Sequence, residues 1–400
     1  MYEKSKVYLD EFSKYVIMQP FPFVVDLKNS HGMWIHTVDD DELFDWCGYY
    51  GSKFIGHNHP KMFEPAYVEK LVYAANNKMA NPDFLTPECV EYYRKLYELA
   101  PKCMVNPDLE IYAVNSGAEA NENALKVASF HTNKSRVIAF DNSFHGRTSA
   151  AVAVTDNKKI VAPLNAQQVV TFLPLNQIDL VEAELKKGDV CAVIIEPIQG
   201  VGGLDQGTTE FFQALEKVCK ANEVILILDE VQSGYGRSGK FFAHQHHGIN
   251  PDIVTTAKGM GNGFPIGGVL ISPKFKASYG LLGTTFGGSH LACAAGIAVL
   301  DVMESKNLME NTNKVSEYFF EAIKVIPEII KVKGRGLMLG VEFDFDVSAL
   351  RKKMIIEKHI FTGGANNKNL LRILPPLTIT TDAIDTFIVA LQESLAELKS

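Results

Sequence analysis

The chain contains 400 residues, of which 46% are hydrophobic and 22% are charged, and its net charge is −8. These proportions are typical of a globular protein and exclude a largely disordered one. The acidic balance, together with the lack of a long basic run, argues against nucleic acid or an anionic membrane as a partner.

Cysteine usage and the first residues bear on the cellular compartment. The six cysteines are far apart and form no CxxC pair, which favours reduced thiols over a disulfide framework or a zinc site. Residues 1–12 contain no apolar stretch typical of a signal peptide, and no later run is long enough to span a membrane. We therefore expect a cytoplasmic protein. The cysteines are Cys47, Cys89, Cys103, Cys191, Cys219 and Cys293.

The two ends of the chain share a mixed pattern. Residues 1–45 and 305–400 contain amphipathic helical patterns and short strands, the latter around residues 334–343 and 370–379. We expect these two segments to pack together as a smaller α+β domain. Residues 46–304 would then form a large domain, since a chain of this length is long enough for two.

Between residues 109 and 271, apolar runs that predict strands alternate with helical patterns such as residues 209–222. Because the strand runs are apolar at every position, we expect an α/β fold with a mostly parallel sheet that helices cover on both faces. The helical pattern of residues 117–130 places Ala120, Ala124, Val127 and Ala128 on one face. The predicted strands are residues 109–115, 136–140, 190–195, 224–228, 253–257 and 267–271.

Polar or glycine-rich segments follow five of these strands. In open α/β sheets, ligands bind at the carboxyl ends of the strands. We therefore expect these segments to converge on one crevice. They read NSGAEAN, DNSFHGRT, EPIQGVGG, DEVQSG and KGMGNG.

The first of these segments places Ser116 and Gly117 at a strand-to-helix turn. A helix N-terminus presents unpaired backbone N–H groups and a partial positive charge, so it can hold a phosphate without a lysine. An ordinary N-cap serine would read the same way in the sequence.

Two charged residues follow neighbouring strands. Asp229 ends an apolar run, where a carboxylate loses hydration unless it meets a cation such as a protonated ring nitrogen, although it could instead cap the next turn. Lys258 follows another run, and burial there would let its amine lose a proton and attack a carbonyl, although most lysines are solvated surface groups. A phosphate site, an amine and a carboxylate together suit pyridoxal 5′-phosphate, which has a phosphate, an aldehyde and a ring nitrogen.

The sequence resembles the class III (ω-amino acid) aminotransferases, which are fold-type I pyridoxal-phosphate enzymes, and among them the acetylornithine and succinylornithine branch. The resemblance covers essentially the whole chain. It implies a large domain around a mostly parallel sheet, and a homodimer in which Thr285 reaches the phosphate bound by the neighbouring subunit. The matching motifs are NSGAEANENALK, FHGRT, EPIQG, LILDEVQSGYGRSG, HGINPDIVTTAKGMGNGFPIGG, GTTFGG, GRGLMLG and LRILPPL.

The resemblance also implies a role for each matched residue. Lys258 would carry the cofactor aldehyde as a Schiff base and move the proton during catalysis, and Asp229 would pair with the pyridinium nitrogen. Gln232 would donate to the phenolic oxygen. The other residues expected at the cofactor are Ser116, Gly117 and Ala118 at the phosphate, Phe144 and Val231 on the ring faces, and Glu196 nearby. Outside these motifs, an aromatic and a valine at such places would be interpreted as core residues.

Two arginines would bind the substrates, since a guanidinium makes paired hydrogen bonds to a carboxylate. By resemblance, Arg147 would take a carboxylate of the amino donor and Arg372 the α-carboxylate of 2-oxoglutarate, whereas an isolated arginine more often forms a surface ion pair. Relatives read EPIQGE, whose last glutamate masks the second arginine, but this chain has Val201 there. Arg372 would then stay available to dicarboxylates, or to a donor such as N-succinylornithine, whose acyl group ends in a carboxylate.

The expected reaction is transfer of the δ-amino group of N-acetyl- or N-succinylornithine to 2-oxoglutarate, a step of arginine metabolism that gives the N-acylglutamate semialdehyde and glutamate. Ornithine, 4-aminobutyrate and lysine ω-aminotransferases are the alternatives, followed by a pyridoxal-phosphate aminomutase. A nicotinamide-dependent oxidoreductase is disfavoured because no GxGxxG opens a helix. No metal site is expected, because the histidines of GHNHP and HQHHG lack a matched set of further ligands.

Overall fold

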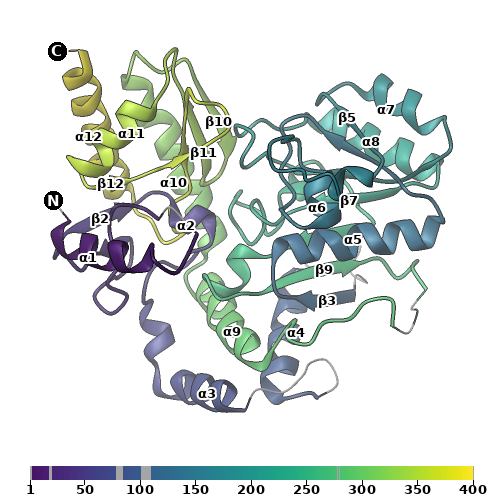
Figure 1. The fold of residues 1–400 in the computed structure, drawn as a ribbon, viewed down its shortest axis with the longest axis horizontal. Coiled ribbons are helices and arrows are strands. Elements are labelled where there is room, and N and C mark those ends of the chain that lie inside the picture. The colour runs from purple at the N-terminus through teal and green to yellow at the C-terminus, as the bar shows by residue number, and fades with distance from the viewer. Residues whose placement is uncertain are drawn as a thin grey trace.

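The computed structural model describes residues 2–17, 20–77, 84–100, 110–276, 278 and 280–399. Figure 1 shows the two ends of the chain gathered on one side of the molecule and a large sheet with its helices on the other. Within the described residues, no helix is both long and apolar enough to cross a membrane.

The large sheet has seven strands in the order β3-β9-β8-β7-β6-β4-β5. Every neighbouring pair is parallel except those of β9, which runs antiparallel to both β3 and β8. The carboxyl ends of the parallel strands therefore meet at one edge. The strands are β3 (Glu110–Val114), β4 (Arg136–Phe140), β5 (Val170–Leu173), β6 (Val190–Ile195), β7 (Ile225–Asp229), β8 (Ile253–Thr256) and β9 (Gly267–Ile271).

Helices cover both faces of this sheet, so alternate residues of a strand enter two different apolar cores. In β7, Ile225 and Ile227 share a core with α5 (Gly117–Thr132), whereas Leu226 and Leu228 pack with α7 and α8. This double burial explains why the strand sequences are apolar at every position. The other helices along the sheet are α6 (Ser149–Ala153), α7 (Ile178–Leu185) and α8 (Thr209–Ala221).

The terminal segments form two smaller sheets. One is antiparallel, with the order β10-β11-β14-β13. In the other, β1-β2-β12, strand β2 of the N-terminal segment pairs in parallel with β12 of the C-terminal segment and so ties the two ends together. The strands are β1 (Trp34–His36), β2 (Glu42–Asp45), β10 (Lys331–Arg335), β11 (Met338–Glu342), β12 (Ile360–Phe361), β13 (Gly363–Gly364) and β14 (Leu370–Ile373).

The remaining helices belong to the terminal segments or connect them to the large sheet. Helices α4 and α9 pack against each other along this connection. The helices are α1 (Glu3–Phe12), α2 (Gly48–Gly51), α3 (Pro65–Asn76), α4 (Pro87–Leu99), α9 (His290–Ser305), α10 (Leu308–Ala322), α11 (Ser348–Ile356) and α12 (Thr381–Lys399). Short 3-10 turns lie at Pro60–Phe63, Asn165–Gln167, Ala243–His246, Lys258–Gly261 and Ile323–Val325.

The expected α/β fold with a mostly parallel sheet is confirmed, and each of the predicted strands ends within one residue of an observed one. The sequence missed β5, a four-residue strand at the sheet edge with only Leu173 buried. The domain boundaries near residues 46 and 304 stay predictions. Among the cysteines, Cys103 lies outside the described residues, and the other five are free.

Candidate active site

A cavity of about 480 Å³ lies where the strands of the large sheet end. The segments after β3, β4, β6, β7 and β8 all contribute to its wall, so the five segments expected to converge do so. Of the residues singled out in the sequence, Arg372 and Thr285 do not line it. Those that do are Ser116, Gly117, Ala118, Phe144, Arg147, Glu196, Val201, Asp229, Val231, Gln232 and Lys258.

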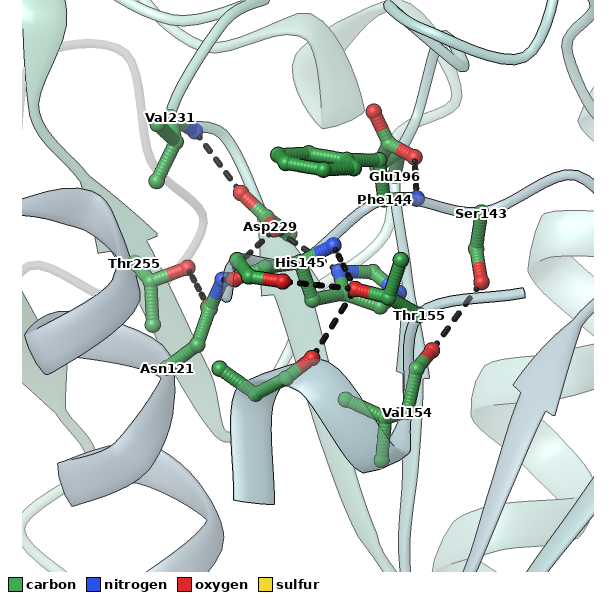
Figure 2. A network of polar contacts seen from close by, with 12 residues as sticks. Asn121, Ser143, Phe144, His145, Val154, Thr155, Glu196, Asp229, Val231 and Thr255 are labelled. Carbon is green, nitrogen blue, oxygen red and sulfur yellow. Dashed lines mark hydrogen bonds and ion pairs between the residues drawn. The ribbon is translucent and has the colours of Figure 1, made fainter. Parts of the chain in front are cut away.

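Asp229, the last residue of β7, lies in a network of polar contacts at the floor of this cavity (Figure 2). Its Oδ2 accepts a hydrogen bond of 2.8 Å from Asn121 Nδ2 and lies 2.8 Å from His145 Nδ1. Its Oδ1 accepts from the backbone N–H of Val231 at 3.0 Å. With these partners and only 4% of its surface exposed, the carboxylate is held in one orientation.

Sequence reasoning missed Asn121 and His145, which support this carboxylate. Thr255 donates a hydrogen bond to Asn121 Oδ1 at 2.7 Å, so the amide is turned with its Nδ2 toward Asp229. An asparagine on the same buried face of α5 as Ala120 and Ala124 was the available signal. A buried amide needs partners, and here they are two polar strand residues.

Lys258 begins a short 3-10 turn just after β8. Its φ of 34° lies in the left-handed region, which costs energy for any residue with a side chain. Burial lowers the pKa of its amine to about 8, although the nearby Asp229 carboxylate opposes the change. At neutral pH an appreciable share of this amine is therefore unprotonated and nucleophilic.

Glu196 follows β6 and joins two of the converging segments. Its Oε1 accepts from the backbone N–H of Phe144 and its Oε2 from that of Gly200, both at 2.9 Å. Burial raises the pKa of this carboxyl to about 7, with the Asp229 carboxylate acting in the same direction and His145 opposing. The side chain therefore positions the Phe144 ring and the loop that carries Val201.

The N-terminus of α5 points its first residues at the cavity. Ser116 is the N-cap and accepts a hydrogen bond from the backbone N–H of Glu119 at 3.2 Å. Ser116 therefore caps the helix, as an ordinary N-cap serine does. Gly117 is needed for close packing, because a Cβ there would lie 2.6 Å from a methyl group of Val231. This contact brings the helix N-terminus next to the end of β7, close enough for one ligand to touch both.

The two arginines have different surroundings. Arg147 is exposed and lies over the Phe144 ring, 5.1 Å from its centre, on the cavity wall. Arg372, in β14, is only 5% exposed and donates from Nη1 to the carbonyl of Gly200 at 2.8 Å. Burial lowers the pKa of Arg372, and its Nε has no hydrogen-bond partner among the described residues.

Two further residues, Tyr50 and Thr285, lie outside the lining of the cavity. Tyr50, which sequence reasoning missed, is half exposed and lies 5.9 Å from the Arg372 guanidinium, measured to the ring centre. It sits within four consecutive left-handed residues, Gly48–Gly51, whose run GYYG was a weak signal of an unusual turn. Thr285 is exposed in the loop before α9, away from the cavity of its own chain.

The fold and the cavity point to an enzyme of amino-group chemistry, and comparison with known proteins shows its family. The family model for class III aminotransferases ("Aminotransferase class-III") matches residues 17–395, and this chain belongs to that family. The family depends on pyridoxal phosphate, and its members act on amino donors and keto acids.

Individual relatives support the same assignment. The chain is 33% identical to the acetylornithine aminotransferase of Caldanaerobacter subterraneus, over all of this chain and 99% of that protein. It is 37% identical to that of Bacillus subtilis, over 93% and 95% of the two chains. Its fold matches a solved structure of the ornithine aminotransferase from Toxoplasma gondii with a TM-score of 0.86 and 24% identity, over 99% and 96% of the chains. That structure has pyridoxal phosphate at partial occupancy in its active site.

Proposed function

We propose that this aminotransferase moves the δ-amino group of an N-acylated ornithine to 2-oxoglutarate with pyridoxal 5′-phosphate. The products are the N-acylglutamate semialdehyde and glutamate. The observation that carries the proposal is one cavity lined by a partly unprotonated amine, a buried carboxylate and a helix N-terminus. The acetylornithine aminotransferases among its relatives suggest the donor.

The residues present fit this cofactor. The N-terminus of α5, with Ser116, Gly117 and Ala118, would hold the phosphate through backbone N–H groups. Asp229 would meet the ring nitrogen, while Phe144 and Val231 would lie on the two ring faces. Gln232 is buried beside them, and its Oε1 has no hydrogen-bond partner among the described residues. Because the phenolic oxygen accepts hydrogen bonds, it would pair with Nε2 of this amide and not with Oε1.

When bound, pyridoxal phosphate supplies an aldehyde that amines attack and a ring that withdraws electrons from the neighbouring carbon. Lys258 would be the covalent anchor of the cofactor. The Lys258 amine would also take up and return the proton of the donor δ-carbon, a task that suits a pKa near 8. Asp229 would keep the ring nitrogen protonated, because its carboxylate is negative and is held in place by Asn121, His145 and Val231.

The arginines would bind the carboxylates of both substrates. Arg147 is on the cavity wall and is free to meet the donor carboxylate, whereas Arg372 would need to offer its unpaired Nε edge to 2-oxoglutarate.

We also propose a homodimer with shared sites. Thr285 lies in an exposed loop outside its own cavity, which suits a residue that reaches a phosphate in the neighbouring subunit.

A panel of amino donors with 2-oxoglutarate tests this proposal. We expect the highest kcat/KM for N-acetyl- or N-succinylornithine, with lower values for ornithine, lysine and 4-aminobutyrate. Faster turnover of ornithine or lysine would replace the proposed donor, and turnover without 2-oxoglutarate would indicate an aminomutase. Purified protein without the visible absorbance of bound pyridoxal phosphate would remove the cofactor assignment.

A further inference from the structure

Helices α4 and α9 lie side by side (Figure 1). Two thiols and an imidazole meet in their contact, outside the active-site cavity. Cys89 lies in the first turn of α4 and Cys293 in the first turn of α9. Both side chains are fully buried. The proposed transamination uses neither of them.

The contacts within this cluster are close. Cys89 Sγ lies 3.1 Å from His290 Nδ1 and 3.6 Å from the hydroxyl of Thr86. The Cys293 thiol donates a hydrogen bond to the Cys89 sulfur. Both sulfurs also reach the backbone carbonyl of Gly288, Cys89 at 3.9 Å and Cys293 at 3.3 Å.

This arrangement divides the chemistry between the two thiols. Hydrogen bonds from Cys293, His290 and Thr86 lower the pKa of Cys89 to about 5 against the effect of burial, and its place at a helix N-terminus also favours a thiolate. Donation to Cys89 raises the pKa of Cys293, which therefore stays a thiol. A nucleophilic thiolate beside a second, protonated thiol is the usual arrangement of a thiol pair that oxidises reversibly.

We propose that Cys89 and Cys293 are a peroxide-modification site that closes to a reversible disulfide. The Cys89 thiolate attacks one oxygen of hydrogen peroxide, the O–O bond breaks, and the leaving hydroxide takes a proton to become water. The Cys293 sulfur then attacks the sulfenic sulfur of Cys89, loses its proton and displaces the hydroxyl as a second water. Overall, two thiols and one peroxide give one disulfide and two waters, with His290 placed to relay the protons.

A cavity large enough for a small oxidant borders this cluster at His290. A cavity of about 340 Å³ is lined by His290, Ser289 and Phe286, next to the cluster. Its volume is many times the roughly 30 Å³ that one water occupies in the liquid, so a peroxide molecule fits. The three other described cysteines are less reactive, because burial raises the pKa of Cys47 and of Cys191 to about 11 and that of Cys219 still further.

Oxidation would also reach the active site. A disulfide changes the contacts that both sulfurs make with the carbonyl of Gly288, in the loop that carries Thr284. The hydroxyl of Thr284 accepts hydrogen bonds from Gly287 N–H at 3.1 Å and from Asn115 Nδ2 at 3.2 Å. Asn115 in turn lines the active-site cavity next to Ser116. A change at Gly288 is therefore passed to a loop that contacts this wall.

The test treats the holoenzyme with hydrogen peroxide and maps its peptides without reduction. We expect one cross-link, Cys89–Cys293, that dithiothreitol reverses, and a loss of kcat of about fivefold, as expected for a change coupled to a site at a distance. Cys89→Ser and Cys293→Ser should each abolish the cross-link and the reversible loss of activity, whereas Cys191→Ser should retain both. The proposal would be overturned if the wild-type map showed Cys89 overoxidised but unlinked, or linked to another cysteine. This result comes from the wild-type protein alone, so it holds even if a variant fails to fold.

The peptide map is independent of the donor proposed above. Activity is followed with whichever donor the panel selects, so failure of the ornithine assignment leaves the cross-link result interpretable. A cross-link without any change of kcat would overturn the coupling to the active site.

Discussion

The active site has two ends that are built differently, the sheet end at the cavity and the terminal end beside it. At the sheet end, Asp229 and Glu196 each accept hydrogen bonds from neighbours that follow or flank the parallel strands. At the terminal end, outside the cavity wall, lie Arg372 of the C-terminal segment and Tyr50, the first with a buried Nε that is unpaired among the described residues and the second in a left-handed turn. Both oxygens of each carboxylate at the sheet end are thus paired, whereas Arg372 at the terminal end keeps hydrogen-bonding capacity for a substrate.

At the sheet end, we expect the substitution Lys258→Ala to cause the largest loss of activity. We expect kcat to fall by about 10⁴-fold, because the variant loses both the nucleophile and the group that moves the proton. Steady-state turnover with the preferred donor measures this loss. Lys53→Ala is the matched control, since burial also lowers the pKa of Lys53, which lies over the Tyr49 ring. Comparable losses in both variants would remove the special role of Lys258.

Asp229→Asn should be the next most damaging change, lowering kcat by about 10²- to 10³-fold, because an amide cannot hold a proton on the ring nitrogen electrostatically. Glu230→Gln is the control. Glu230 is the adjacent carboxylate, but it accepts from the backbone N–H groups of Ala243 and His244 instead of lining the cavity. We expect that variant to unfold at a lower temperature and to keep its turnover. The opposite result, with Glu230 limiting turnover and Asp229 limiting stability, would exchange their roles.

The buried Glu196 carboxyl at the sheet end should make the free energy of unfolding depend on pH. Its folded-state pKa is raised from 4.5 to about 7, so its stabilising contribution is complete below pH 4.5 and is lost as the pH rises through 7. Relative to Glu196→Gln, cofactor-free wild-type protein should lose about 3 kcal/mol of unfolding free energy between pH 4.5 and 8. Urea unfolding of both proteins across this range measures the difference. A constant difference would show that Glu196 does not titrate there.

The same contrast explains what the sequence could predict. Asp229 and Lys258 follow apolar runs, so their convergence follows from a parallel sheet alone. Asn121 was missed because its partner Thr255 is distant in the chain and only packing of α5 on β8 brings them together. The contact of Arg372 with Gly200 spans 172 residues and joins a small sheet to a loop of the large one. No local pattern in the sequence encodes a contact of that kind.

The smallest predicted effect probes the terminal end, where Val201→Glu would supply the missing acidic partner for Arg372. Val201 lines the cavity, and its neighbour Gly200 already binds the guanidinium through its carbonyl. We expect KM for 2-oxoglutarate, and for N-succinylornithine if it uses Arg372, to rise about fivefold, the effect of a partly solvated ion pair. KM for N-acetylornithine should change less, because its acyl group has no carboxylate. Val201→Gln has the same shape without the charge, so an equal rise in both variants would show that size, and not masking of Arg372, is responsible.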